Sequence, residues 1–265
     1  LSSGTDHALF RLGKEYVVRL PRVDWTTENI NKEYKWVPKI APLLKIPVSI
    51  PLFKGSPNQY FPESWIVTKW NEGQNPPFEI ENEYNQLAQD LAYFLNELHG
   101  IDLPGGPFSR RGVPLKELDT ETKGALSKLD GEIDISSVTY LWEQLSNIPL
   151  WNKVPVWVHG DFLPGNILIQ NHRLRAVIDF SDVGIGDPAC DLVIAWSLLN
   201  PQSRRIFKEN LENIDDDTWE RGRGWALSIA LIMLPYYKYS NPVLVSLAHR
   251  TIENVLGDLF KPHEM

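Results

Sequence analysis

The sequence is poor in cysteine and in long apolar runs, and each deficit excludes a class of protein. Among 265 residues it has one cysteine, Cys190, so it can form neither an internal disulfide nor a cysteine-based zinc cluster. We therefore expect a reducing compartment, the cytoplasm. The longest apolar run extends from Trp225 to Leu234, is interrupted by Ser228, and is shorter than the roughly 20 residues that cross a bilayer, so no membrane span is expected.

The sequence also lacks an excess of basic charge. Its formal net charge is −8, which argues against a nucleic-acid partner because phosphate binding needs a basic face. The charge is uneven, since residues 1–70 include 10 basic and 6 acidic residues and the rest of the chain includes 16 and 28. This asymmetry suits a protein that holds an anion in its first part and a cation in its second, although chance and solubility explain it as well.

The first 70 residues are predicted to be rich in β-structure. Alternating and β-branched runs flank Gly13-Lys14, as in a β-hairpin, and a capping signature precedes a helical pattern. A segment rich in glycine, asparagine and proline, residues 71–77, indicates a connector to the rest of the chain. The expected elements are a hairpin over 7–12 and 15–20, a helix over 27–40, and strands over 48–53 and 65–70.

Beyond the connector, apolar residues recur mainly at helical spacing. The chain is therefore predicted to be α+β, with a small N-terminal lobe over 1–70 and a larger, mostly helical C-terminal lobe over 71–265. Because the sequence does not begin with methionine, we expect further residues upstream of the first lobe. The expected elements are helices over 79–99, 120–129, 138–145, 192–199, 204–211, 218–234 and 241–260, a strand over 155–158, and a hairpin over 166–170 and 174–179.

A polar loop between two apolar strands carries the most informative residues. Asp161 and Asn166 lie on this loop, and Asp179 ends the following hairpin, which would bring all three side chains to one rim. Phosphoryl transfer needs such a set: one carboxylate receives the proton of the acceptor, while an amide oxygen and a second carboxylate hold Mg²⁺. Either acid alone is explained equally well as a turn residue, but the whole set at this spacing favours phosphoryl transfer.

The segment His159–Asp161, with Asn166 and then Ile178–Phe180 beyond it, resembles the catalytic loop and metal-binding motif of the aminoglycoside phosphotransferase family. That family is similar to protein kinases, choline kinases and homoserine kinases. The resemblance implies a protein-kinase-like fold, with a nucleotide-binding N-terminal lobe and a C-terminal lobe that binds the acceptor. The likeness continues through residues 3–6, 17–22, 184–192, 221–227 and 234–237.

The resemblance also implies roles for single residues. Asp161 would be the catalytic base, or the residue that orients the acceptor hydroxyl. Asn166 and Asp179 would be ligands of Mg²⁺, with ATP or GTP as the phosphoryl donor. His159 would be structural, and Asp191 would cap the backbone of the catalytic loop.

In the first lobe, Arg19 occupies the strand position where kinases use a lysine, and Glu33 is its expected partner on the helix. Arginine binds phosphate in a bidentate manner, so this departure is compatible with nucleotide binding, although the alternative of a solubilising charge stays open. The glycine loop is weak, because Gly4 stands without the usual spacing. By resemblance, the adenine ring would contact the backbone near Thr68 and Trp70.

A cationic acceptor such as an aminoglycoside would need carboxylates around it. Two features weaken this expectation: Arg110 and Arg111 lie on a loop expected near the acceptor, and the acidic run at 215–217 also suits a helix start. Asp187 is expected either to cap backbone or to face the substrate. The candidate acceptor-binding residues are Asp182, Asp187, Asp216 and Glu220.

The sequence thus predicts a magnesium-dependent enzyme that transfers a phosphoryl group to a small-molecule hydroxyl, with an aminoglycoside as the first candidate. A kinase for another small alcohol, of the choline, homoserine or sugar type, is the alternative within enzymes. A nucleotide-binding pseudokinase is a third hypothesis, motivated by Arg19 and the weak glycine loop.

Overall fold

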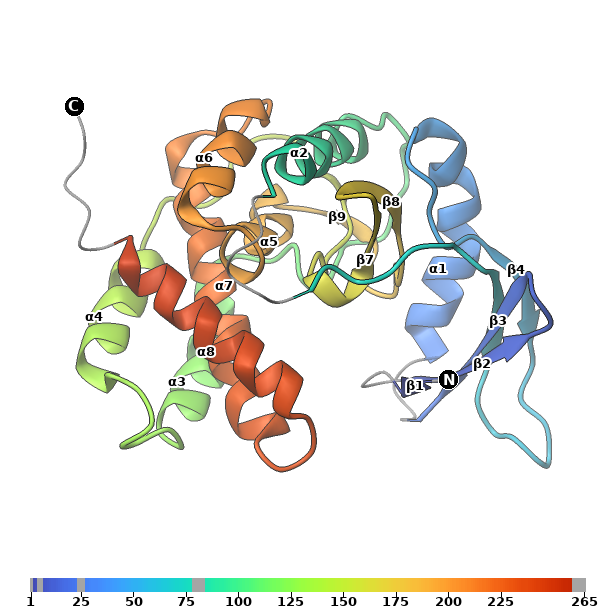
Figure 1. The fold of residues 1–265 in the computed structure, drawn as a ribbon, viewed down its shortest axis with the longest axis horizontal. Helices are drawn as coiled ribbons and strands as arrows, with labels where there is room; N and C mark the ends of the chain where they lie inside the picture. Colours follow the sequence, from blue (N-terminus) through green and yellow to red (C-terminus); the bar gives the residue numbers. More distant parts are fainter. Residues whose placement is uncertain (1, 4–6, 23–26, 78–83, 259–265) are drawn as a thin grey trace.

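The computed structural model describes residues 2–3, 7–22, 27–77 and 84–258, which form two lobes (Figure 1). A small lobe with an antiparallel sheet, blue in the figure, lies beside a larger lobe of helices, and short strands lie between the two. The predicted α+β architecture with a small β-rich lobe and a larger helical one is confirmed.

The N-terminal lobe is a five-stranded antiparallel sheet in the order β1-β2-β3-β5-β4, with helix α1 packed against β4 and β5. The hairpin between β2 and β3 turns at Gly13, whose φ of 62° is a left-handed conformation that glycine adopts without strain. The elements are β1 Ser2–Ser3, β2 His7–Leu12, β3 Tyr16–Pro21, α1 Thr27–Ile40, the 3₁₀ turn η2 Ala41–Leu43, β4 Pro51–Gly55 and β5 Trp65–Lys69.

Strand register puts an arginine on the buried face of this sheet. Arg19 of β3 lies directly opposite Ile66 of β5, and Thr68 shares that face because side chains alternate along a strand. All three are buried beneath α1. The guanidinium of Arg19 is therefore directed toward the helix and away from solvent.

The C-terminal lobe is built around α7, which packs against α3, α4, α8 and the 3₁₀ helix η5. Its core includes the fully buried tryptophans Trp142, Trp157, Trp196 and Trp225. Within the described residues no helix is long and apolar enough to cross a membrane. The helices are α2 Asn85–His99, η3 Leu115–Leu118, α3 Asp119–Leu126, α4 Ile135–Leu145, η4 Pro164–Asn166, η5 Pro188–Val193, α5 Ile194–Ser197, α6 Pro201–Asn210, α7 Asp216–Tyr237 and α8 Pro242–Gly257.

Side-chain caps fix where several of these helices begin. The Asn or Asp residue that precedes each helix accepts a hydrogen bond from a backbone N–H in the first turn, which satisfies a donor with no partner inside the helix. The capping residues are Asp134 for α4, Asn200 for α6, Asp215 for α7 and Asn241 for α8.

Two short antiparallel pairs position the segment between the lobes. Strand β6 Val156–Val158 pairs with β9 Gly184–Gly186, and β7 Ile167–Gln170 pairs with β8 Arg173–Val177. The second pair turns through Asn171 and His172, both with positive φ, as a two-residue hairpin loop requires. The backbone N–H of Gln74 joins the connector to β7, and the backbone N–H of Ser49 joins the N-terminal lobe to β8.

Three differences from the expected elements stand out. Residues 192–199 form the end of η5 followed by the four-residue helix α5, instead of one helix. Strands β1 and β9 were not expected, because two or three residues are too few to show the alternation of apolar and polar side chains that indicates a strand. The beginning of the helix expected over 79–99, the end of the one expected to reach 260, and Gly4 lie outside the described residues.

Candidate active site

The loop between β6 and β7 brings Asp161 and Asn166 together. The Asn166 side-chain nitrogen donates to the carbonyl of Asp161 and to its carboxylate, both at 2.8 Å. Because the backbone carbonyl can only accept, the amide nitrogen must face Asp161, and the amide oxygen of Asn166 is turned away from it. Asn166 therefore orients the Asp161 carboxylate and offers an oxygen to a ligand.

Asp191 supports the backbone of this loop from below. Its buried carboxylate accepts hydrogen bonds from the backbone N–H of His159 at 3.0 Å and of Gly160 at 2.8 Å. The ring nitrogen Nε2 of His99 lies 3.0 Å from the same carboxylate. Asp191 thus makes the backbone contacts expected of it and does not reach the rim where Asp161 lies.

His159 connects the loop to the end of β8. Its ring nitrogen Nδ1 accepts from the backbone N–H of Asp161 at 3.2 Å, so the proton is on Nε2, which donates to the carbonyl of Ile178 at 3.0 Å. The ring is fully buried and packs against Phe180, with 4.5 Å between ring centroids. This arrangement fits a neutral histidine that holds two segments together.

Asp179 follows β8 in a strained backbone conformation. Its φ of 62° lies in the left-handed region that residues other than glycine seldom occupy. The conformation is held by a hydrogen bond from its N–H to Ser49 Oγ at 3.2 Å. Such strain is found where a side chain must be aimed at a ligand, and the carboxylate of Asp179 stays 35% exposed.

Arg19 links the two lobes through a pair of carboxylates. One terminal nitrogen lies 2.6 Å from Glu33 of α1 and the other lies 2.6 Å from Asp179. Burial disfavours the charged guanidinium, but the negative charges of Asp179 and Glu33 outweigh it and raise the pKa of Arg19. The expected partner Glu33 is thus in contact with Arg19, and Arg19 also holds a candidate metal ligand.

The pKa values of Asp161 and Asp179 are shifted in opposite directions. Burial raises the pKa of Asp161 to about 6, although the positive charge of Arg111 opposes the shift. For Asp179, burial also acts to raise the pKa, but the charge of Arg19, together with smaller contributions that include a hydrogen bond from Ser181, outweighs burial and lowers the pKa to about 2. Two acids with separated pKa values suit different tasks, one exchanging a proton and the other staying ionised.

The site fits a magnesium ion shared with a phosphate ligand. The amide oxygen of Asn166 and the carboxylate of Asp179 are hard oxygen donors, the kind that Mg²⁺ prefers. Within the described residues, no group of three or more His, Cys, Asp or Glu side chains is arranged to hold a metal. A cation here would need phosphate oxygens and water to complete its coordination, which is how Mg²⁺ is commonly bound beside nucleotides.

The end of β5, just before the connector, carries the two residues expected near an adenine ring. Thr68 is buried within β5, and Trp70 follows the strand. The backbone N–H of Trp70 already donates to the carbonyl of Glu15 at 2.7 Å, and the guanidinium of Arg11 lies 3.8 Å from the centre of its ring. Because this N–H already has a partner within the protein, it is not available to donate a hydrogen bond to an adenine ring.

A sequence model described as the phosphotransferase enzyme family matches residues 1–225. The chain belongs to this family. An Escherichia coli aminoglycoside 3′-phosphotransferase is 29% identical to it over 166 residues, 58% of this chain and 61% of the relative. The uncharacterized protein YcbJ of Bacillus subtilis is 23% identical over 180 residues, 66% of this chain and 56% of that protein. The chain thus spans less than two thirds of the length of these relatives.

Solved structures of the phosphotransferase family share the fold over nearly the whole chain. An APH(2″) aminoglycoside phosphotransferase in complex with GDP and kanamycin has a TM-score of 0.75 at 19% identity, covering 98% of this chain and 93% of its own. A macrolide 2′-phosphotransferase of Brachybacterium faecium has a TM-score of 0.64 at 19% identity, covering 99% and 91%. The predicted two-lobe, protein-kinase-like fold is confirmed.

Two of the acids expected to bind the acceptor are paired inside the protein. Asp187 is buried, caps η5 by accepting from the Ala189 N–H, and lies 2.6 Å from Arg221, which matches the capping alternative expected for it. Asp182 is also buried and lies 3.3 Å from Arg110 and 3.8 Å from Arg111. These arginines lie 34 to 72 residues away in the sequence, so the local sequence around each acid gave no sign that they would be in contact.

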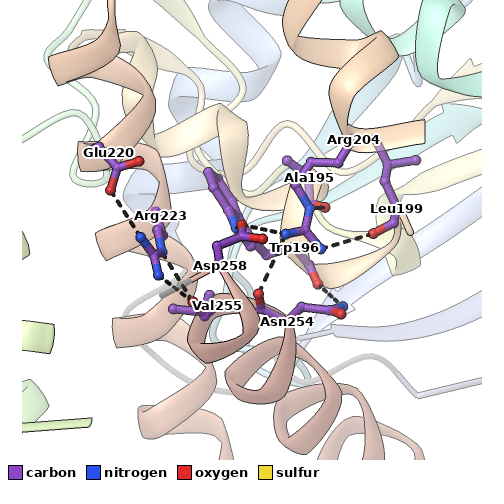
Figure 2. Close-up of polar contacts among 9 residues, drawn as sticks. All are labelled: Ala195, Trp196, Leu199, Arg204, Glu220, Arg223, Asn254, Val255 and Asp258. Atoms are coloured by element: carbon purple, nitrogen blue, oxygen red, sulfur yellow. Dashed lines mark hydrogen bonds and ion pairs between the residues drawn. The ribbon is translucent and has the colours of Figure 1, made fainter. Parts of the chain in front are cut away.

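The other two acids are also engaged elsewhere. Asp216 lies in the first turn of α7 and pairs with Lys208 of α6 at 2.9 Å, which matches the helix-start interpretation of the acidic run. Glu220 lies 3.3 Å from Arg223, whose guanidinium donates to the Val255 carbonyl near the end of α8 (Figure 2). Each of the four carboxylates thus has a cationic partner among the described residues, and their role in binding an acceptor stays a prediction.

Figure 2 shows that Glu220 belongs to a cluster that anchors α8. Arg204 of α6 reaches the carboxylate of Asp258 at 2.6 Å and the carbonyls of Ala195 and Leu199 at 3.0 and 3.4 Å. The indole nitrogen of Trp196 donates to the same carboxylate at 2.9 Å. Carbonyls at a helix end lack partners within the helix, so buried arginines here stabilise the structure.

One residue close to the catalytic loop was missed. Asn75 donates its side-chain amide to the carbonyls of Gly165 and Ile167 at 2.8 and 2.9 Å, and to Pro164 at 3.3 Å. It thereby fixes the connector onto the segment that ends at Asn166. The sequence places Asn75 in a turn-rich stretch, where asparagine is common for local reasons, so nothing marked this long-range contact.

Proposed function

We propose that this chain transfers the γ-phosphoryl group of a nucleoside triphosphate, ATP or GTP, to a hydroxyl of a small molecule. Three contacts support the proposal: Asn166 donates to the Asp161 carboxylate, the backbone N–H of Ile178 donates to the carbonyl of Asn166 and so brings the neighbouring Asp179 close to this loop, and Arg19 joins Asp179 to the sheet. A phosphotransferase needs these groups in one place, and the family membership supports the same activity.

Each group has a task in this reaction. Asp161 accepts the proton of the acceptor hydroxyl, and Asn166 keeps its carboxylate in position. Asn166 and Asp179 would hold Mg²⁺, which supplies positive charge against the phosphate oxygens. Arg19, fixed by Glu33, orients Asp179 and adds positive charge beside it.

Two classes of acceptor have support. An aminoglycoside acceptor is favoured by the similarity to the E. coli aminoglycoside 3′-phosphotransferase, and it would make the protein a cytoplasmic antibiotic-resistance enzyme. A less cationic alcohol, including the choline, homoserine and sugar types, is favoured by the internal pairing of Asp182, Asp187, Asp216 and Glu220.

Release of nucleoside diphosphate, measured with Mg²⁺, ATP or GTP, and a panel of acceptors, tests the proposal. Turnover with aminoglycosides supports the first acceptor class, and turnover only with other alcohols supports the second. Nucleotide binding without turnover across a broad panel would favour the pseudokinase hypothesis over an enzyme. The Asp161→Asn variant serves as the control for contaminating activity.

The pKa of Asp161 predicts how the transfer rate depends on pH. The base works only when ionised, so kcat/KM should be constant above about pH 7 and fall roughly tenfold per unit below about pH 6. In Arg111→Gln the midpoint should move upward, because Arg111 no longer opposes protonation of Asp161. An unchanged midpoint of the pH profile of kcat/KM in this variant would mean that protonation of the nucleotide, and not of Asp161, sets the pH dependence.

Magnesium dependence follows from the two proposed ligands. In Asp179→Asn one anionic ligand is lost, so we expect the Mg²⁺ concentration for half-maximal nucleotide binding to rise about tenfold or more. Fluorescent nucleotide titrations at several Mg²⁺ concentrations measure this change. The exposed Asp102→Asn variant is the matched control, and an equal Mg²⁺ requirement in all three proteins would exclude Asp179 as a ligand.

A further inference from the structure

A loop outside the family's motif residues brings two arginines to the catalytic region. Residues 107–112, here called the arginine loop, run alongside β9 and are held by backbone hydrogen bonds. The N–H of Ser109 donates to Ile185 at 3.0 Å, the N–H of Ile185 donates to Pro107 at 2.8 Å, and the N–H of Asp187 donates to Gly112 at 3.2 Å. The arginine loop therefore has a fixed position relative to β9.

Packing presses the arginine loop onto β9 and the catalytic loop. A Cβ atom on Gly186 would lie 2.5 Å from the Cα of Gly112, and one on Gly160 would lie 2.9 Å from the Cβ of Asp182. Ser109 Oγ donates to the carbonyl of Asp182 at 2.8 Å. Gly160 directly precedes Asp161, so Asp182 and the arginine loop are immediate neighbours of the proposed base.

Arg111 is the member of this loop best placed to act. Its Nε lies 3.8 Å from the Asp182 carboxylate, and its side chain is 30% exposed. Among the described residues its ion pair with Asp182 is made through Nε and not through the two terminal nitrogens, and its positive charge acts on the Asp161 carboxyl. Arg110 also pairs with Asp182, but its side chain is 57% exposed. Asp182 therefore orients the Arg111 guanidinium through Nε and leaves its two terminal nitrogens available to a ligand.

We propose that Arg111 is a catalytic residue, whose guanidinium binds oxygens of the γ-phosphoryl group during transfer; this inference rests on the proposed function. The acceptor oxygen forms a bond to the γ-phosphorus while its proton passes to Asp161. The bond from the γ-phosphorus to the bridging oxygen breaks, and its electron pair leaves with the nucleoside diphosphate. Arg111 gains and loses no proton, and it contributes charge and hydrogen bonds.

The position beside Asp161 favours this role because the acceptor hydroxyl and the phosphoryl group meet there. An ionised Asp182 next to the reacting phosphate would repel it, and pairing with Arg110 and Arg111 removes that repulsion. A planar guanidinium matches two phosphoryl oxygens at once, a geometry that lysine cannot reproduce.

The test compares wild type with Arg111→Gln and Arg111→Lys. We expect Arg111→Gln to lower two rates about 100-fold, the hydrolysis of nucleoside triphosphate with water as acceptor and the kcat for transfer at saturating acceptor. In Arg111→Lys both rates should fall only about tenfold, because lysine keeps the positive charge but cannot bind two phosphoryl oxygens in a bidentate manner. Nucleotide affinity and the thermal midpoint should change little, and the exposed Arg205→Gln variant on α6 should match wild type.

Three outcomes are informative. Unchanged hydrolysis and kcat in Arg111→Gln would overturn the inference while leaving the proposed function intact. Unchanged hydrolysis with a raised acceptor KM would also overturn it, and would assign Arg111 to an anionic group of the acceptor. A wild-type protein that neither binds nor turns over nucleotide would instead refute the proposed function.

Discussion

Replacing Asp161 with asparagine is expected to lower kcat for phosphoryl transfer by about 10²–10⁴-fold. The amide keeps the size of the side chain and can still accept from Asn166, so the loop geometry should persist. What is lost is the capacity to take the proton of the acceptor, which matters mainly in the transition state. The affinity for nucleotide should therefore stay within about threefold of wild type.

Steady-state kinetics with the acceptor found by the panel, together with nucleotide titrations, measure both quantities. The exposed Asp102→Asn variant controls for the chemical change alone. A kcat for Asp161→Asn within a few-fold of wild type would show that another group receives the proton.

The second large effect is expected at Arg19 and concerns stability. Glu33 is fully buried, and among the described residues its Oε2 atom has no hydrogen-bond partner, so Arg19 is the cation that compensates its charge. In Arg19→Met this charge is left uncompensated. We expect the free energy of unfolding to fall by about 3–5 kcal/mol, the typical cost of breaking a buried ion pair from one side.

The double variant Arg19→Met/Glu33→Leu separates stability from ligand binding. With both charges removed, most of the lost stability should return, since apolar replacements of a buried pair are well tolerated. Nucleotide binding should be weaker than in wild type in both the single and the double variant, because neither has Arg19 to hold Asp179. Urea unfolding and nucleotide titration of the three proteins provide the comparison, and an Arg19→Met protein as stable as wild type would contradict the role of Arg19.

Local patterns predicted much of the fold. The helix over 27–40 and the strand over 65–69 follow from periodicity, since each buries one face, and the hairpin at Gly13 follows from its turn residues. The spacing of Asp161, Asn166 and Asp179 likewise predicted that they lie near one another, and the pairing of Ile167 with Val177 returns the chain to the start of β7.

The pairing of charges could not be predicted in the same way. Asp182 meets Arg110 and Arg111, and Asp187 meets Arg221, across separations of 34 to 72 residues. These contacts depend on how the arginine loop runs along β9 and how α7 packs on η5, and neither leaves a periodic signal in the sequence. An acid that is internally compensated therefore looks the same in sequence as one that awaits a cationic ligand.

The most direct test of the active-site assignment is a crystal structure with Mg²⁺ and a non-hydrolysable nucleoside triphosphate analogue. The expected result is a phosphate tail between Arg19 and Asp161, with the cation in contact with Asn166 and Asp179 and the γ-phosphoryl group facing Asp161. A nucleotide bound elsewhere, or a cation held by other residues, would contradict the assignment.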